Sequence, residues 1–161
     1  MTLQEAKQNI DNLARGPETI SKAVEGLNSG ALRYKPAPDK WCVLEIVAHL
    51  ADVEIVQGHR LRQALAEPQP SFAPMDQEAW AAHLGYAETP VEDSLEAFRV
   101  ARKANLRLLR RISEGDLNKG GYHPELKRVL TVAEIIQRLA AHDPNHLGQI
   151  ERVKQQAKPK F

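Results

Sequence analysis

Hydrophobic residues recur every three or four positions along most of this chain, which is the spacing of one face of an amphipathic helix. The first such run consists of Leu3, Ala6, Ile10 and Leu13. It predicts a helix from Thr2 to about Ala14, which the Gly16-Pro17 pair is expected to interrupt. Helical spacing resumes from Glu18 to Leu27, before the turn sequence Asn-Ser-Gly.

Three longer segments show the same spacing. They cover Asp39–Glu67, Thr89–Ser113 and about Thr131–Gln156. Asp39 is the expected N-cap of the first, and Thr89 caps the second, where Glu92 follows three residues later as in a capping box. A short helix is expected from Asp76 to Leu84, again with the aspartate as its cap. The stretches 34–40, 68–74 and 114–130 lack this periodicity and are expected to be loops.

Long helices joined in this way predict a four-helix bundle of the all-α class. The chain has the length of one domain, and no internal repeat or linker divides residues 1–161. Dense apolar residues between Trp41 and Val56 predict that the second long segment is buried on more than one side. Because this segment and Leu147 leave apolar surface beyond one bundle face, we expect a two-fold homodimer.

Opposite charges nearly cancel, with 22 Lys and Arg against 21 Asp and Glu, for a formal net charge of +1. This balance argues against nucleic acid or a membrane surface as the main partner. A basic cluster in the 89–113 segment is expected to be a solvated helix face. It comprises Arg99, Arg102, Lys103, Arg107, Arg110 and Arg111.

The expected location is the cytoplasm. Cys42 is the single cysteine, which excludes an internal disulfide and fits a reducing compartment. The first residues form an acidic amphipathic pattern without the apolar core of a signal peptide, and no stretch reaches transmembrane length. Cys42 itself is expected to be a small buried residue instead of a reactive thiol.

Candidate chemistry lies in the stretch "LAAHDPNHLGQIERV", where His142 and His146 fall one helical turn apart. On a helical wheel both project with the apolar residues of this segment. A buried imidazole needs partners for its ring nitrogens, and a shared divalent metal would satisfy both. Hydrogen-bonded core or interface histidines are the alternative. Pro144 lies between them, and we expect a kinked but continuous helix with both rings facing inward.

His49 is the third histidine of interest, in the second long segment. Its neighbours on the helix surface include Glu45 and Asp52. These carboxylates either accept hydrogen bonds from the ring, as partners of metal-bound histidines do, or mark a solvated stripe. The remaining histidines, His59, His83 and His123, are expected on the surface or in loops.

The two regions together resemble the DinB-like superfamily of metalloenzymes. Its pattern is roughly W-[ST]-x-x-E-x-x-x-H-[LI]-x-[DE]-x-E, followed late in the chain by H-x-x-x-H-x-x-x-[IL]. Here "WCVLEIVAHLADVE" matches the first part, with cysteine in place of serine or threonine, and His142, His146 and Ile150 match the second. The resemblance implies an up-down-down-up four-helix bundle. It also implies a zinc or nickel ion held by His49, His142 and His146, with a position left open for water.

Members of this superfamily include transferases and isomerases that use bacillithiol or mycothiol. The resemblance therefore implies a metal-dependent enzyme that transfers a low-molecular-weight thiol to a small electrophilic molecule, or a related hydrolase. Asp52 is a candidate base or fourth ligand. A pocket is expected between the second and fourth bundle helices. The alternative is a non-catalytic, dimerising metal-binding protein of the stress response, and a nucleic-acid binder is a weaker third reading.

Overall fold

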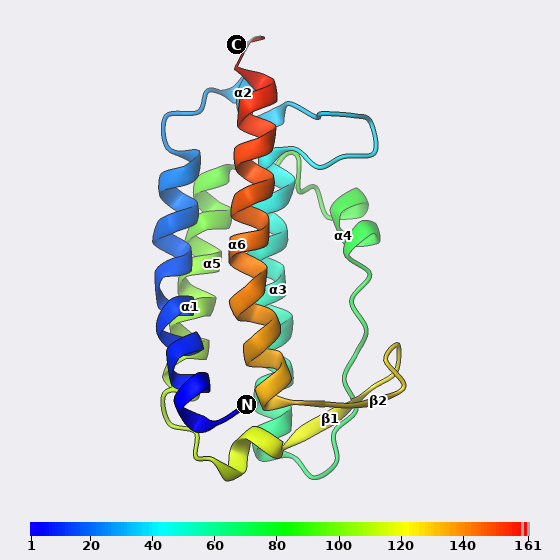
Figure 1. Ribbon diagram of the computed structural model, residues 1–161. Helices are drawn as coiled ribbons and strands as arrows, with labels where there is room; N and C mark the ends of the chain where they lie inside the picture. Colours follow the sequence, from blue (N-terminus) through cyan, green and yellow to red (C-terminus); the bar gives the residue numbers. More distant parts are fainter. Residues whose placement is uncertain (159, 161) are drawn as a thin grey trace.

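The computed structural model describes residues 1–158 and residue 160, and within them four long helices form a bundle (Figure 1). The long helices are α1 (Leu3–Val24), α3 (Val43–Ala66), α5 (Val91–Leu109) and α6 (Val132–Ala157). Two short helices, α2 (Ser29–Arg33) and α4 (Gln77–His83), and the 3₁₀ helix η1 (Gly115–Asn118) lie in the connections. The strands are β1 (Gly120–His123) and β2 (Arg128–Thr131).

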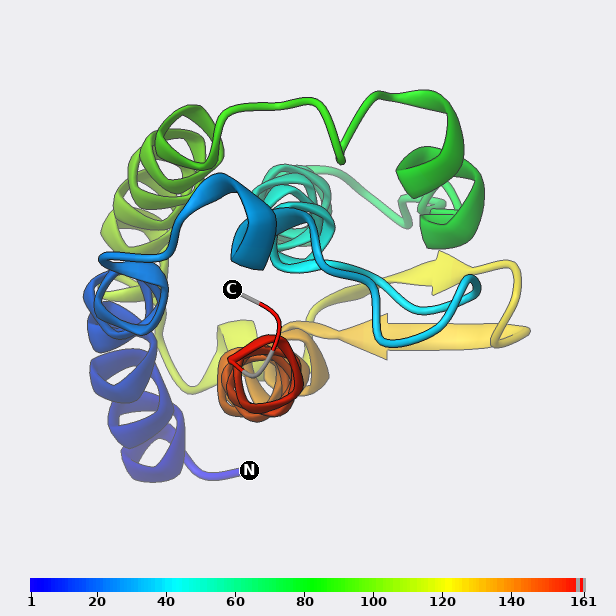
Figure 2. The same cartoon turned by 90° about the horizontal axis from the view of Figure 1, so that it is seen from above.

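The long helices run up, down, down and up in chain order, as the resemblance implied (Figure 1). Helix α1 packs against α5 and α6, and α3 packs against the same two helices. Seen along the bundle axis, the hairpin β1–β2 and helix α4 lie to one side of α3 and α6 (Figure 2). The predicted all-α bundle is confirmed, and among the described helices none is long and apolar enough to span a membrane.

Two of the expected helix starts are correct. Asp76 caps α4 by accepting a hydrogen bond from the backbone N–H of Ala79 at 3.0 Å. Thr131 caps α6, where Thr131 and Glu134 form a reciprocal capping box. Such boxes satisfy N–H groups that the first helical turn leaves without partners.

The other two expected caps are wrong. Helix α3 begins later than Asp39, with Cys42 at the N-cap, and Glu45 Oε2 accepts from the Cys42 N–H at 2.8 Å. Helix α5 has Pro90 at its N-cap, because the Thr89 hydroxyl donates backwards to the Gly85 carbonyl at 2.9 Å. The threonine thus ends the preceding turn and leaves the first turn of α5 without a side-chain cap.

The predicted interruption at Gly16-Pro17 is also wrong, since α1 is continuous through both residues. Proline cannot donate to the carbonyl four residues earlier, which belongs to Leu13. The side chain of Arg102, on α5, donates to that carbonyl from Nη1 at 2.6 Å. A tertiary contact therefore replaces the hydrogen bond that Pro17 removes.

The segment 114–130 contains a two-stranded antiparallel hairpin as well as η1, where a loop was expected. Tyr122 extends the pairing on its other side, because it exchanges backbone hydrogen bonds with Pro70 and Phe72 of the 68–74 loop. A Cβ atom at Gly121 would lie 2.4 Å from the Phe72 ring, so glycine is required for this close packing. The hairpin and the 68–74 loop therefore form one unit beside the bundle.

Buried polar groups divide the hydrophobic core into two halves. One half, toward the hairpin, contains Leu13, Val53, Leu106 and Leu139. The other, toward the C-terminus, contains Ile20, Ala51, Phe98 and Ile150. The groups between them, called the polar layer below, are Glu54, Arg102, Asp143 and the histidines His49, His142 and His146.

Candidate metal centre

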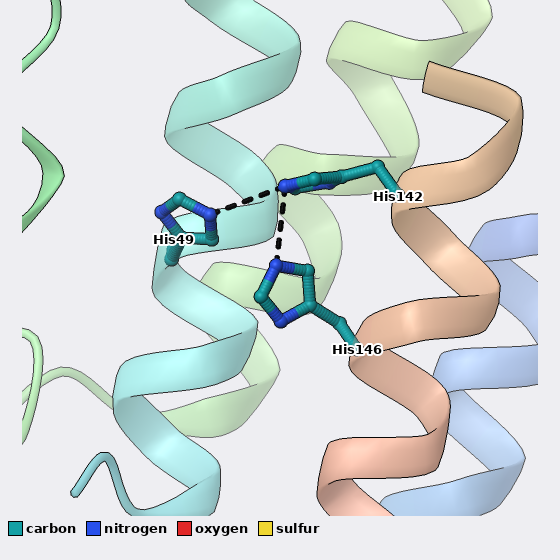
Figure 3. A group of neighbouring side chains, drawn as sticks. All are labelled: His49, His142 and His146. Atoms are coloured by element: carbon teal, nitrogen blue, oxygen red, sulfur yellow. Dashed lines mark hydrogen bonds between the residues drawn. The ribbon is translucent and has the colours of Figure 1, made fainter. Parts of the chain in front are cut away.

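Three histidine side chains from two helices converge in the polar layer (Figure 3). His142 Nε2 lies 3.2 Å from His49 Nε2 and 3.1 Å from His146 Nε2. The ring centroids are 4.4 to 5.2 Å apart. The structure thus brings together the three residues that the sequence pattern singled out, with one nitrogen of each ring directed at a common point.

These distances fit a shared metal ion. Ligand nitrogens at about 2.0–2.1 Å from a tetrahedral ion are separated by about 3.3 Å. Two of the three separations, at 3.1 and 3.2 Å, are close to that value, and all three ligand atoms lie within 4.8 Å of one another. Cysteine and carboxylate oxygens are absent from this cluster among the described residues, so the donor set is three imidazoles. Three protein ligands leave at least one coordination position open, as in catalytic zinc sites.

The hydrogen-bond partners of the rings favour the same interpretation. His146 Nδ1 lies 2.8 Å from the amide oxygen of Gln149, which can only accept, so Nδ1 carries the hydrogen. The Nε2 of His146 therefore keeps its lone pair toward the cluster. His142 Nε2 could offer a hydrogen to only one of its two neighbours, whereas a cation would satisfy all three nitrogens at once.

The rings are held as neutral imidazoles, the form that binds metals. Burial lowers the pKa of His49 to about 4, and the neighbouring His146 adds to this effect. Burial and the other two histidines lower the pKa of His142 to about 3. Burial also lowers the pKa of His146, against opposing contributions from Gln149 and Asp143. At neutral pH, protons therefore do not compete for the three lone pairs.

Ion pairs in the polar layer lie immediately beside the histidines. Arg102 donates to both oxygens of Asp143, at 2.7 and 3.0 Å, and its Nη2 lies 2.9 Å from Glu54 Oε1. Asn105 also donates to Glu54, at 2.9 Å. Burial opposes the charge of Arg102, but Asp143 and Glu54 outweigh it, so the pKa of Arg102 rises above its usual value.

Arg102 therefore corrects the expectation of a solvated basic face on α5, because its side chain is only 3% exposed. The other members of that cluster are exposed as expected. Two buried carboxylates against one arginine leave a charge of −1 beside three neutral rings, which favours a cation there. The bidentate contact also anchors Asp143, the residue next to His142.

Helix α6 is continuous through Pro144, as expected, so His142 and His146 remain one turn apart on the same face. Pro144 itself is exposed. Both histidines point toward α3 (Figure 3).

The two carboxylates expected near His49 have other partners. Asp52 accepts a hydrogen bond from the hydroxyl of Tyr86, and burial together with this contact raises the tyrosine pKa. Glu45 is paired with Lys35 at 2.7 Å and with the N–H of Cys42. Neither forms part of the histidine cluster. His49 instead packs against the Trp41 ring, at 4.8 Å between centroids, and its Nδ1 has no hydrogen-bond partner among the described residues.

Cys42 is a buried free thiol that is 1% exposed, as predicted. Burial raises its pKa above the ordinary value. Because only the thiolate is a strong nucleophile, this residue is unsuited to thiol chemistry. Any thiol that takes part in a reaction at the histidines would have to come from a second molecule.

A pocket of about 660 Å³ opens beside the cluster and lies between α3, α6 and the hairpin. His49 and His142 line it, together with the polar residues Gln57, Arg60, Gln77, His123, Glu125, Arg138 and Asn145. His123, expected on the surface, is buried in β1, whereas His59 and His83 are exposed as expected. The position of a pocket between the second and fourth bundle helices agrees with the prediction.

Sequence reasoning missed Arg60 and His123 as pocket residues. Arg60 follows His49 by eleven positions, which is close to three full helical turns and returns to the same face. That spacing was available in the sequence. His123 carried no comparable signal, because its place depends on the hairpin that was expected to be a loop.

Known proteins similar to this chain are described as metal-dependent, which agrees with the cluster of three histidines. The sequence pattern of the DinB superfamily matches residues 12–150. The chain is 26% identical over 141 residues to "Putative metal-dependent hydrolase YfiT" of Bacillus subtilis (strain 168), covering 88% of this chain and 79% of that protein. A protein of Oceanobacillus iheyensis with the same description, OB0782, is 30% identical over 141 residues, covering 88% of this chain and 81% of that protein.

A solved structure shows the same architecture. The structure of Bacillus subtilis YfiT, described as having an unusual four-helix bundle topology, matches with a TM-score of 0.92 at 23% identity. The match covers 98% of this chain and 90% of that chain. Since the superfamily pattern spans most of the sequence and the fold agrees, this chain belongs to the DinB superfamily.

Proposed function

We propose that this protein is a metal-dependent enzyme that acts on a small electrophilic molecule, either by hydrolysis or by transfer of a low-molecular-weight thiol. The observation that carries the proposal is the convergence of three neutral imidazole nitrogens at the wall of an open pocket. The description of two relatives as metal-dependent hydrolases supports hydrolysis. Thiol transfer rests on the resemblance of the sequence motifs.

His49, His142 and His146 would hold the ion through Nε2. A bound divalent ion would lower the pKa of a water or thiol and so supply a nucleophile at neutral pH. Gln149 fixes the tautomer of His146, and Arg102 anchors the adjacent turn of α6 through Asp143. Trp41 packs against the His49 ring at an interplanar angle of 56°, which limits the approach of water from that side.

Several finer features belong to the same proposal. Zinc or nickel is the proposed ion, because both bind imidazole nitrogen well. A cytoplasmic location is supported by the single, reduced and buried cysteine. The proposed partners are the electrophile, a free thiol and a second copy of the chain in a homodimer, with no role for nucleic acid or membrane.

The first experiment measures the metal content of protein prepared without a histidine tag and reconstituted with zinc or nickel. We expect one equivalent per chain, and well below one equivalent in His146→Ala. The matched control is His59→Ala, an exposed histidine on α3 that should keep full occupancy. A wild type that stays metal-free after reconstitution would refute the metal site.

The second experiment separates the two reactions from simple metal binding. Electrophiles and hydrolysable esters or amides would be screened with and without metal, and with and without several added thiols. Turnover that needs metal alone indicates a hydrolase, and turnover that also needs a thiol indicates a transferase. Activity should disappear in His49→Ala while the helical circular dichroism stays unchanged. Stoichiometric metal without turnover across the panel would favour a non-catalytic metal-binding protein.

A further inference from the structure

The pocket beside the histidines contains a buried arginine without a carboxylate partner. Arg60 is 5% exposed, and its one hydrogen bond among the described residues runs from Nη2 to the Ala73 carbonyl at 2.6 Å. Its Nε is buried and unpaired. The Nε of Arg102 is also buried and unpaired, but Arg102 differs from Arg60 because it contacts two carboxylates. A buried guanidinium that lacks an anion is costly unless a ligand supplies one.

Further groups around Arg60 also lack partners. His123 Nδ1 and Gln57 Oε1 are both buried and without a hydrogen bond. Arg138, an exposed residue of α6, lines the same pocket and forms no ion pair among the described residues. The acidic member of the lining is Glu125. Two arginines against one glutamate leave the pocket positively charged, before any metal ion is counted.

The spacing along the helices places both cations on the hairpin side of the histidines. Arg60 lies eleven residues after His49 on the same face of α3, which corresponds to about 16 Å along the helix axis. Helix α6 runs antiparallel to α3 and begins at the hairpin end of the bundle (Figure 1). Arg138 lies one turn before His142 on α6, so it is displaced from the histidines toward that end. Both arginines are therefore displaced from the histidines toward the hairpin, Arg138 by about 6 Å and Arg60 by about 16 Å along the helix axes.

We infer that this pocket binds a small molecule with a terminal anionic oxygen group, a carboxylate or a phosphate, which Arg60 and Arg138 hold. The planar guanidinium offers paired donors that match both groups. Gln57 and His123 would accept from or donate to polar atoms between the two ends. That the opposite end of the molecule reacts at the histidines rests on the proposed function, whereas the anion site stands on the pocket alone.

The test uses metal-stripped protein, so that an anion cannot bind through a metal ion. Succinate and inorganic phosphate would be titrated at constant ionic strength, with the neutral diamide succinamide as the uncharged analogue. We expect saturable binding of at least one anion and none of succinamide. The side-chain Nε–Hε resonance of Arg60 in nitrogen-15 spectra should shift during the anion titration, because that donor lacks a protein partner.

Arg60→Gln and Arg138→Gln should each weaken anion binding, by about tenfold or more for the buried Arg60. Arg107→Gln, which removes an exposed arginine of α5 outside this pocket, is the matched control and should leave affinity unchanged. Should Arg60→Gln fail to fold, Arg138→Gln and the wild-type Arg60 resonance still decide the question.

Three results would overturn the inference: no saturable anion binding, equal binding of succinamide, or an equal loss of affinity in Arg107→Gln. The outcome is independent of the proposed function, because no metal or turnover is involved. Conversely, a failure of His146 to bind metal would leave the anion titration unaffected.

Discussion

Substitution of Gly16 by alanine tests whether the polar layer is packed as tightly as its contacts indicate. Gly16 is buried in the middle of α1. A Cβ atom there would lie 2.0 Å from Asp143 Oδ2 and 2.9 Å from Arg102 Nη1. Both atoms belong to the buried ion pair, and the same Nη1 also donates to the Leu13 carbonyl. Neither side chain can therefore move away without losing a partner.

The expected magnitude follows from two opposing effects. Alanine is more favourable than glycine inside a helix by about 1 kcal/mol. Loss of a buried ion pair costs about 3–5 kcal/mol when one charge is left uncompensated. Gly16→Ala should therefore lower the free energy of unfolding by about 2–4 kcal/mol. In a domain of this size the corresponding fall in Tm is about 4–16 °C.

The matched control is Gly148→Ala in α6, where the added Cβ would meet only the flexible end of Arg152, at 3.4 Å. That variant should be stabilised by up to about 1 kcal/mol, because it gains helix propensity without a clash. Urea denaturation followed by circular dichroism compares the two variants directly. If Gly16→Ala is as stable as Gly148→Ala, the ion pair yields freely and the inferred rigidity of the layer is wrong.

Three other predictions follow from burial and charge. Without metal, the protein should lose stability as the pH falls from about 6.5 toward 4. In this range His49 and His142 bind protons in the unfolded chain but not in the folded chain, where their pKa values are about 4 and 3. Urea denaturation across this range measures the free energy of unfolding, and a value that does not change with pH would contradict the prediction. Cys42 should react with alkylating reagents far more slowly in the native than in the unfolded protein, because its thiol is buried and its pKa is raised; equal rates would show that the site opens. A homodimer should appear in light scattering at tens of micromolar. Most of the apolar residues of α3 on which this prediction rests are buried within the chain, and Ile55 is the large hydrophobic residue of α3 that stays exposed. A monomer at this concentration would refute the prediction.

The histidine cluster could be predicted because its signal is local and periodic. His142 and His146 share a face with apolar residues of their own helix, and His49 lies in an apolar stretch. Burial on the two helices then requires that their inward faces meet. The family motif supplied the pairing between helices, which periodicity alone does not determine.

Among the remaining errors, one arises from a contact between residues distant in sequence, and two have local causes. Helix α1 continues through Pro17 because Arg102, 89 positions after Leu13, donates a hydrogen bond to the Leu13 carbonyl. The local sequence predicts a break at the proline, and only this distant contact explains why there is none. The burial of Arg102, by contrast, could have been predicted, because Arg102 lies four positions after Phe98 and four before Leu106, on the apolar face of α5. The start of α3 at Cys42 depends on a local contact, because Glu45, three residues later, accepts the hydrogen bond from the Cys42 N–H.

Burial of the charged groups of the polar layer costs free energy of folding, so a role other than stability should explain why they are there. Replacement of a buried ion pair by apolar side chains of similar volume is often neutral or stabilising, so Arg102, Asp143 and Glu54 are weakly explained by stability alone. Their geometry accounts for them better, because they fix the turn of α6 that carries His142 and add negative charge beside a proposed cation site. Arg60 shows the converse arrangement, a buried cation that contacts no carboxylate among the described residues, with Glu125 elsewhere in the same pocket. Arg102 has two carboxylate partners within the protein and positions the histidines, while Arg60 is left available to a ligand.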